Sequence, residues 1–374
     1  MMHRARKVVV IGGGITGAFA AYFLASLGAE PTVLERGEIG GEASGANAGG
    51  LNPLQGAGIP GPMQELALAS LRLHRETWPR LAGDIEQLGL RTVPRVLLAL
   101  DDAQVRELAA TLELYRATDG LTARWLERDE LRRAEPLLCA DTVGGLWTDG
   151  NARVDPAPYT RAVAAAAQRL GAGLARGEAC GLVHTDGHVR AVELRSGEMM
   201  ACDGVVIATG PWCAEPERWL SIRLGVEPVK GELLLIKPNG ARPRAELAWQ
   251  GVGLYAGPDD CWWLGGTEDR AGYDRSPTES ASARILDGAA RVLPDLRVER
   301  IVRHVAALRP VTEDGLPIVG IPPGYENVCL ALGSGRKGML YGAGLGRAAA
   351  ELLVEGATKL PVTACSPERI GVSA

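Results

Sequence analysis

The chain has 374 residues, enough for one large domain or two interleaved domains with a substantial core. Its 40 Lys and Arg residues against 45 Asp and Glu residues give a net charge of -5, which excludes a basic surface for nucleic acid or anionic lipid. The seven cysteines form no C-x-x-C pair, which argues against a zinc or iron–sulfur site and favours reduced thiols in the cytoplasm. Because no uninterrupted apolar run reaches about 18 residues, no membrane span is expected. Small-molecule chemistry without a metal ion is the default expectation.

The N-terminal segment has the pattern of a strand, a tight turn and a helix. Apolar residues 8–11 lead into Gly12, Gly14 and Gly17, which complete a G-x-G-x-x-G motif. In this motif the first glycine permits the turn, the second lets the backbone approach a pyrophosphate, and the third lets the helix pack on the strand. Glu35 ends the next apolar run, where its carboxylate can accept hydrogen bonds from an adenosine ribose. These features predict a dinucleotide-binding unit.

A secretory signal is the competing interpretation of this segment. Basic residues within 4–7 precede the apolar stretch, and residues 25–29 imitate a cleavage site. Three consecutive glycines inside the apolar region argue against a signal. A signal would also leave Glu35 unexplained.

Residues 37–51 form a loop too long and too rich in glycine for a simple turn. Alanines such as Ala43 and Ala48 suit a solvated linker poorly, so we expect the loop to approach something flat or anionic rather than to be a flexible surface loop. The order of glycine motif, acidic strand end and Ser/Ala/Gly loop resembles the FAD-dependent amine oxidoreductases of the D-amino-acid oxidase superfamily, nearest to the glycine oxidases. The resemblance implies that this loop wraps the FAD pyrophosphate and reaches the flavin ring.

Helices and short strands are expected to alternate through the next part of the chain. Residues 61–78 have the period of an amphipathic helix, and residues 81–140 mix short strands with charged helices, as an inserted substrate domain would. Asp155 and Pro156 mark the start of an Ala-rich helix. His74, like the other histidines, has no visible partner, and a surface or structural role is favoured for it.

Residues 179–203 have the pattern of short antiparallel strands, and residues 204–210 that of a buried strand ending in a tight turn. The resemblance implies that Thr209 and Gly210 lie against the cofactor. It also implies that Ala179 contacts adenine through its backbone. An ordinary strand end is the alternative.

The chain then returns to the expected substrate domain. Residues 228–233, P-V-K-G-E-L, are similar to the family segment that opens a long strand, and residues 253–265 have a hairpin pattern. Tyr255 in this hairpin is a candidate active-site residue, although packing is the commoner role of a strand tyrosine. Residues 276–279, S-P-T-E, have the pattern of a capping box, with Ser276 as the cap of a helix. The resemblance implies a large, mostly antiparallel sheet above the flavin.

Residues 307–320, A-L-R-P-V-T-E-D-G-L-P-I-V-G, resemble the family pattern L-R-P-x-T-x-D-G-x-P-x-I-G. The resemblance implies that Arg309 grips the substrate carboxylate, a role that suits the planar, two-pronged guanidinium. A surface arginine in a salt bridge is the alternative. Leu308 and Pro310 argue against it, because they place Arg309 in an apolar run.

The C-terminal segment combines a strand at residues 328–332, a glycine-rich turn and a final helix. By resemblance, this turn and helix start surround the pyrimidine end of the flavin, where backbone N–H groups near N1 and C2=O stabilise the reduced anion. Arg336 corresponds to a second arginine that lines the site. No cysteine stands near Leu308 or Arg309, where family members with covalent flavin carry one, so FAD should be non-covalent.

The expected fold class is α/β (α+β overall), with a Rossmann-like FAD-binding domain interleaved with an antiparallel-sheet substrate domain, as in glycine oxidase and sarcosine oxidase. The expected FAD-binding domain comprises residues 1–85, 142–215 and 305–374. The expected substrate domain comprises residues 86–141 and 216–304.

The expected reaction is oxidation of a small amino or imino acid of the glycine, sarcosine or D-amino-acid type. Hydride would pass from Cα to flavin N5, the imine would hydrolyse to a 2-oxo acid, and oxygen would be reduced to hydrogen peroxide. The amine lone pair and the flavin make a side-chain acid/base pair unnecessary. The catalytic candidates are Arg309, Arg336 and Tyr255, and the expected cofactor contacts are Gly12, Gly14, Ile15, Thr16, Gly17, Glu35, Arg36, Ala43, Ser44, Ala48, Gly49, Gly50, Ala179, Thr209, Gly210, Gly333, Ser334, Gly335, Arg336, Lys337, Gly338 and Met339.

Two alternatives from other functional classes stay open. The chain could be the flavin subunit of a hetero-oligomeric dehydrogenase for amino acids, proline or opines, which passes electrons to partner redox subunits instead of oxygen. It could instead be a nicotinamide-linked dehydrogenase or a non-catalytic flavin-binding subunit, which Arg309 and residues 333–338 disfavour. A homo-oligomer and a hetero-oligomer are both compatible with the sequence.

Overall fold

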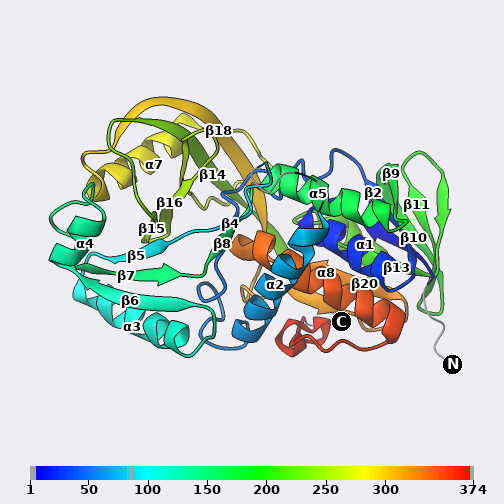
Figure 1. Cartoon of the computed structure of the whole chain (residues 1–374). Helices are drawn as coiled ribbons and strands as arrows, with labels where there is room; N and C mark the ends of the chain where they lie inside the picture. Colours follow the sequence, from blue (N-terminus) through cyan, green and yellow to red (C-terminus); the bar gives the residue numbers. More distant parts are fainter. Residues whose placement is uncertain (1–5, 82, 84–86, 371–374) are drawn as a thin grey trace.

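Two large β-sheets organise the chain, which the computed structural model describes for residues 6–81, 83 and 87–370. In the view of Figure 1 the eight-stranded sheet lies on the left and the six-stranded sheet on the right, with helices packed between and around them. The chain passes several times between the two sheets. This mixed α/β architecture confirms the expected fold class.

The six-stranded sheet has the order β19-β20-β13-β1-β2-β9 and is parallel except for β19, which runs antiparallel to β20. Its central strands are short apolar runs without polar interruption, the pattern of a parallel sheet covered on both faces. The strands are β1 (Lys7–Ile11), β2 (Glu30–Glu35), β9 (Gly173–Arg176), β13 (Gly204–Ile207), β19 (Ile318–Gly320) and β20 (Val328–Leu332).

Four helices build the largest core against this sheet: α1 (Ile15–Ser26), α2 (Gln64–Thr77), α5 (Pro156–Arg169) and α8 (Gly338–Glu355). Helix α1 packs against both α5 and α8. The approach of α1 and α8 is close because a Cβ on Gly346 would lie only 2.6 Å from the Ala20 backbone nitrogen. Small residues at this contact therefore determine how α8 lies over the sheet.

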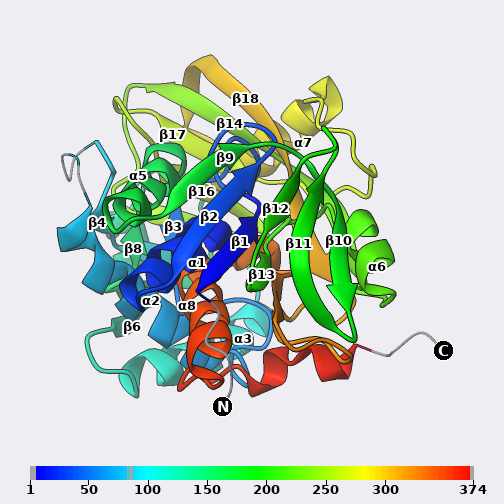
Figure 2. The same ribbon diagram turned by 90° about the vertical axis from the view of Figure 1, so that its right-hand side faces the viewer.

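A second core lies on the other face of the six-stranded sheet. It is formed with the antiparallel sheet β10-β11-β12 and with α6 (Ala214–Leu220). Figure 2 shows the three strands beside β1 and β13. Their bounds are Ala179–Thr185 for β10, His188–Leu194 for β11 and Met199–Ala201 for β12.

The eight-stranded sheet has the order β18-β14-β17-β16-β15-β5-β7-β6 and is antiparallel except for the pair β15 and β5. The long strands β14 and β18 run side by side along its edge. Helices α3 (Asp102–Arg116), α4 (Arg128–Ala134) and α7 (Glu279–Val292) belong to this half. The strands are β5 (Arg95–Ala99), β6 (Thr122–Glu127), β7 (Gly144–Asp149), β14 (Val226–Asn239), β15 (Glu246–Trp249), β16 (Val252–Ala256), β17 (Trp262–Gly265) and β18 (Arg297–Thr312).

A small sheet, β3-β8-β4, links the two halves. Within the described ranges, no helix combines the length and apolar character needed to cross a membrane. The seven cysteines, all within these ranges, are free. The remaining elements are β3 (Gly50–Leu51), β4 (Arg91–Thr92), β8 (Ala152–Arg153), η1 (Trp78–Arg80), η2 (Gly335–Lys337), η3 (Thr363–Cys365) and η4 (Pro367–Arg369).

The expected capping box at Ser276 is wrong by two residues. Helix α7 is capped by Thr278, whose hydroxyl accepts a hydrogen bond from the Ala281 N–H at 3.2 Å. The buried Glu232 carboxylate accepts hydrogen bonds from the Thr278 N–H and hydroxyl and so holds Thr278 in place. A long-range contact, rather than the local pattern, therefore determines where this helix begins.

The division into an FAD-binding and a substrate domain stays a prediction. Strand β7 lies in the eight-stranded sheet, although residues 142–215 were expected in the FAD-binding domain.

His74 is fully buried and joins three helices of the main core. Its Nε2 lies 3.0 Å from the Leu340 carbonyl oxygen and its Nδ1 lies 2.7 Å from the Tyr159 hydroxyl. The carbonyl can only accept, so Nε2 donates to it and Nδ1 accepts from Tyr159, as in a neutral ring. Burial accordingly lowers the pKa of His74 to about 4. The role of His74 is structural.

We predict that His74 makes folding sensitive to acid. Between pH 6.5 and 4 the unfolded chain binds a proton at this site and the folded chain does not, so the free energy of unfolding falls as pH falls. The expected contribution is about 2 kcal/mol between pH 7 and pH 5, measured by urea unfolding. His74→Gln should lessen this pH dependence, whereas substitution of the exposed His184 by Gln should not. Equal pH dependence in all three proteins would contradict the assignment.

Candidate functional site

A cavity of about 640 Å³ lies between the carboxyl ends of the parallel strands and the eight-stranded sheet. Strands β1, β2, β13 and β20 end at this cavity, and residues of β14, β16 and β18 form its opposite wall. Ligands of open α/β sheets bind outside the carboxyl ends of the strands. The cavity therefore occupies the position expected for a cofactor site, with a second wall that a substrate could contact.

The glycine motif forms the turn between β1 and α1 at one end of the cavity. Gly12 has φ +108, a conformation that favours glycine, and a Cβ there would overlap the Ala208 carbonyl oxygen. A Cβ on Gly17 would overlap the Gly12 carbonyl oxygen, so Gly17 allows the helix to pack on the turn. Gly12, Gly14 and Ile15 line the cavity, whereas Gly17 does not. The glycines expected at the turn and at the pyrophosphate thus line the cavity, and the glycine expected to pack helix on strand lies outside it.

Glu35 ends β2 at the cavity wall. Its carboxylate accepts hydrogen bonds from the Gly13 N–H at 2.6 Å and from the Gly37 N–H at 2.7 Å. These two bonds hold the carboxylate in a defined orientation and leave lone pairs for a ligand hydroxyl. Beside it, the Arg36 guanidinium lies 4.4 Å from the centre of the Trp212 ring, and both residues line the same end of the cavity.

The loop from Glu42 to Gly50 follows the cavity wall, as expected for a segment that contacts a cofactor. The Ser44 hydroxyl accepts a hydrogen bond from the Ile15 N–H at 3.0 Å and so connects this loop to the N-terminus of α1. Farther along the chain, Asn52 is buried and lines the cavity, and its Oδ1 has no hydrogen-bond partner. A buried polar atom of this kind calls for a ligand to satisfy it.

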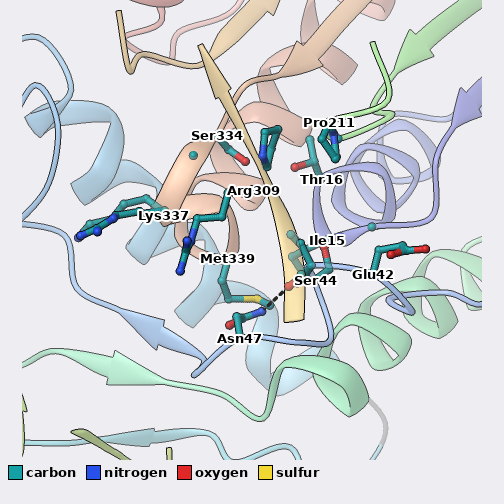
Figure 3. Close-up of a pocket in the computed structure, with 18 of the residues that line it drawn as sticks. Ile15, Thr16, Glu42, Ser44, Asn47, Pro211, Arg309, Ser334, Lys337 and Met339 are labelled. Atoms are coloured by element: carbon teal, nitrogen blue, oxygen red, sulfur yellow. Dashed lines mark hydrogen bonds between the residues drawn. The ribbon is translucent and has the colours of Figure 1, made fainter. Parts of the chain in front are cut away.

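Helix α8 also begins at the cavity, so two helix N-termini face the same space. Gly338 and Met339 in its first turn line the wall, and no side chain caps this end. In the view of Figure 3, Met339 and Lys337 lie on the left and Ile15 of α1 lies on the right. The positive ends of the two helix dipoles favour a ligand with separate electron-rich groups.

Lys337 is enclosed beside the start of α8. Its Nζ donates a hydrogen bond to the Asn52 carbonyl oxygen. Burial, with a smaller effect from nearby Arg95, lowers the pKa of Lys337 to about 7.

Arg309 lies at the end of β18 and is largely buried in the cavity wall. Its guanidinium covers Gly231 of the neighbouring strand β14 and lies close to Gly266, where a Cβ would come within 3.4 Å. One of its nitrogens, Nη1, donates to the Thr267 carbonyl oxygen at 2.8 Å. Burial and then Arg336 lower the pKa of Arg309. Among the described residues no carboxylate forms an ion pair with Arg309, so the surface salt bridge considered above is wrong.

The other two catalytic candidates lie near Arg309 in different settings. Arg336 is half exposed at the cavity rim, where its Nε donates to the Glu268 carboxylate. Tyr255 of β16 extends over Gly253 and lines the cavity. The ring of Tyr255 also lies 5.0 Å from the Arg95 guanidinium carbon.

The structure brings nearly all of the expected site residues to this one cavity. Of the residues named in the sequence analysis as cofactor contacts or catalytic candidates, only Gly17 lies outside the wall. Their individual roles toward a cofactor or substrate stay predictions. Several polar or aromatic residues of the wall were not among the predicted site residues, including Asn47, Asn52, Arg95, Trp212 and Glu268. For Arg95 the sequence did contain a signal of an unusual role, because an arginine is rare in a fully buried strand such as R-V-L-L-A.

FAD fits this wall. The cavity has the size of a cofactor site, Asn52 leaves a buried acceptor atom unpaired, and Glu35 presents an oriented carboxylate. Glu35 would hold the ribose, the N-terminus of α1 and the following loop would hold the pyrophosphate, and the start of α8 would face the pyrimidine end of the flavin. No cysteine or histidine is among the described residues of the wall, so the protein offers no usual side chain for a covalent flavin bond there.

The chain belongs to the family of FAD dependent oxidoreductases, whose family model matches residues 7–352. The protein is therefore a flavoenzyme that binds FAD, and it holds the cofactor non-covalently.

The similar proteins show which members of this family the chain resembles. The chain is 31% identical over 343 residues to glycine oxidase from Pseudomonas putida, with 90% of this chain and 91% of that protein covered. It is 26% identical to the solved glycine oxidase of Geobacillus kaustophilus, with a TM-score of 0.87 and 98% of each chain covered. The solved L-proline dehydrogenase of P. horikoshii has the same fold, with a TM-score of 0.87, 23% identity and 97% of each chain covered.

We predict that Glu35→Ala weakens FAD binding by about ten- to a hundredfold. A carboxylate that accepts hydrogen bonds from ribose hydroxyls contributes roughly 1.5–3 kcal/mol. Titration of the apoprotein with FAD measures the change, and Glu38→Ala serves as the control because Glu38 is exposed on the same loop. Equal affinity of the Glu35 variant and the unchanged protein would contradict a role in FAD binding.

Proposed function

We propose that the protein oxidises a small amino or imino acid and that Arg309 binds the substrate carboxylate. The observation that carries this proposal is a largely buried guanidinium at the cavity wall with only a backbone carbonyl as its described hydrogen-bond partner. A desolvated guanidinium is stabilised best by an anion that accepts two parallel hydrogen bonds. Relatives named glycine oxidase support an amino acid as the source of that carboxylate.

FAD, when bound, supplies the electron sink that accepts hydride from Cα at N5. The protein residues position the substrate and exclude water. Arg309 anchors the carboxylate and thereby limits where Cα can lie. Leu233 and Tyr255 close the wall beside it. The neutral amine supplies electron density for the reaction, so the site requires no histidine or carboxylate as a base.

Hydrolysis of the resulting imine in water gives a 2-oxo acid. We propose oxygen as the electron acceptor, which makes hydrogen peroxide the second product. The relatives named oxidase support this choice. A partner redox subunit is the competing electron acceptor. The two acceptors predict different rates of flavin reoxidation when air is admitted.

The test uses the purified yellow protein and a panel of amino and imino acids. Each compound is mixed with the protein without oxygen while flavin absorbance is followed, and air is then admitted. Bleaching by a carboxylate-bearing amine, followed by rapid recolouring and stoichiometric peroxide, is the expected result. Bleaching with slow recolouring would indicate a dehydrogenase. Failure of every compound to reduce the flavin would overturn the proposed reaction.

We predict that Arg309→Ala lowers kcat/KM by a factor that corresponds to roughly 2–5 kcal/mol, because a desolvated carboxylate is left unpaired. Arg309→Lys should recover only part of the loss, since an ammonium lacks the two-pronged geometry. Stopped-flow flavin reduction provides the measurement, and FAD content should stay nearly constant. An alanine variant that reduces its flavin at the original rate and affinity would transfer the role to Arg336.

A second prediction concerns the glycine below Arg309. A Cβ on Gly231 would overlap the Arg309 guanidinium, so Gly231→Ala should displace that side chain and raise the KM for the amino acid by about tenfold or more. FAD affinity should change little. Gly288→Ala in α7 is the matched control, because a Cβ there meets only one side-chain atom, at 3.9 Å. An unchanged KM in the Gly231 variant would mean that Arg309 does not depend on this glycine.

A further inference from the structure

Arg95 is a second buried arginine in the cavity wall, and the proposed reaction has not used it. It lies at the start of β5 and is only 6% exposed. Its Nε has no hydrogen-bond partner, and its guanidinium lies over the Tyr255 ring. Arg95 lines the same cavity as Arg309. Among the described residues no carboxylate forms an ion pair with Arg95, and a buried cation at a cavity wall without an ion pair indicates a place for an anion.

The charges around Arg95 are not balanced by the protein. The buried Glu246 is the register partner of Arg95 between β15 and β5. Glu246 is shared, because the buried Arg153 lies 3.5 Å from it and forms the ion pair. Lys337, which also raises the positive potential, is bonded to a backbone carbonyl. Arg153 also interacts electrostatically with Asp155, whereas among the described residues Glu246 is the carboxylate whose charge acts on Arg95.

The FAD phosphates do not account for this excess charge. They are expected at the N-terminus of α1 and along residues 42–50, on the side of the six-stranded sheet. Arg95 instead belongs to the eight-stranded sheet, as Arg309 does. The missing anion should therefore come with the substrate.

The two arginines flank Tyr255. Arg309 crosses β14 toward Gly266, just beyond the end of β17, and Arg95 reaches the Tyr255 ring on β16. Strands β16 and β17 are neighbours, so the two guanidinium groups are separated by about one to two strand spacings, or roughly 5–10 Å. A small molecule with two acid groups can span this distance.

We propose that Arg95 is a specificity-determining residue that binds a second acid group of the substrate, so that the preferred substrate is a dicarboxylic amino or imino acid. This inference rests on the proposed function, since it takes Arg309 as the site of the first carboxylate. Tyr255 separates the two binding points and packs against Arg95. The second acid group is carried either by the amine nitrogen or by the side chain, and both place a carboxylate on the far side of Tyr255.

A binding test that requires no turnover examines the inference directly. The oxidised holoenzyme is titrated with malonate, succinate and glutarate, and with acetate, propionate and butyrate, while the flavin spectrum is followed. At least one diacid should bind the unchanged protein about tenfold or more tighter than its monoacid counterpart. Arg95→Gln should abolish most of this ratio, and Arg95→Lys should restore part of it. Arg91→Gln, which removes an exposed arginine from nearby β4, should keep the ratio.

Two outcomes would overturn the inference. One is a protein that binds no diacid more tightly than the monoacids, a result that needs no variant and holds even if Arg95→Gln does not fold. The other is a ratio that Arg95→Gln leaves unchanged. A third result separates the two proposals. If no amine reduces the flavin but the diacid preference still depends on Arg95, the proposed reaction is contradicted and the second acid site is supported.

Anaerobic reduction with matched substrates then identifies the source of the second acid group. Sarcosine is compared with iminodiacetate, which adds a carboxylate on the nitrogen arm, and both enantiomers of alanine are compared with those of aspartate and glutamate. The inference is supported if one diacid series has a higher kcat/KM than its monoacid partner and if Arg95→Gln lowers the diacid kcat/KM far more than the monoacid kcat/KM. The series that meets both conditions shows whether the second acid group lies on the nitrogen or on the side chain. Equal losses for diacids and monoacids would contradict it, because a merely structural Arg95 would affect both alike.

Discussion

A guanidinium removed from water must be compensated by acceptors or by an anion, and the position of Arg309 imposes this requirement on the whole substrate wall. The side chain is held over Gly231 by the pairing of β14 with β18, and a single described carbonyl accepts from it. This arrangement is costly in an empty cavity and favourable when a carboxylate enters. In the proposed function, the long antiparallel pair thus positions a strand residue, Arg309, to bind an anion.

The cavity wall beside the parallel sheet has different chemistry from the wall that holds Arg309. There the protein offers backbone N–H groups and dipole ends, from the starts of α1 and α8, and one oriented carboxylate, Glu35. These groups suit a ligand with phosphates at one end and ribose hydroxyls beside them. In the proposed function the parallel sheet supplies the cofactor wall and the antiparallel sheet supplies the substrate wall, so substitutions in one wall are expected to leave the role of the other largely intact. The predicted insensitivity of FAD affinity to changes at Gly231 follows from this division.

Local patterns predicted many of the residues that line the cavity beside the parallel sheet. Gly12, Gly14 and Glu35 were recognisable because neighbouring residues create the turn, and resemblance to a known family placed Arg309 and residues 333–339. Features that depend on distant contacts were missed. Gly231 matters only because β18 pairs beside it, and Thr278 caps α7 only because Glu232, 46 positions away, holds it. Arg95 is a charge in an apolar strand, but its place in the cavity wall was missed because it depends on the order of strands in the sheet.

In the proposed function a substrate carboxylate binds Arg309 while Cα faces the flavin. A crystal structure of the FAD complex with acetate, which has the carboxylate and the α carbon but no amine, tests this claim most directly. Acetate oxygens are expected within hydrogen-bond distance of the Arg309 guanidinium, with the methyl carbon directed toward flavin N5. Acetate bound elsewhere in the cavity, with Arg309 still paired only to the Thr267 carbonyl, would contradict it.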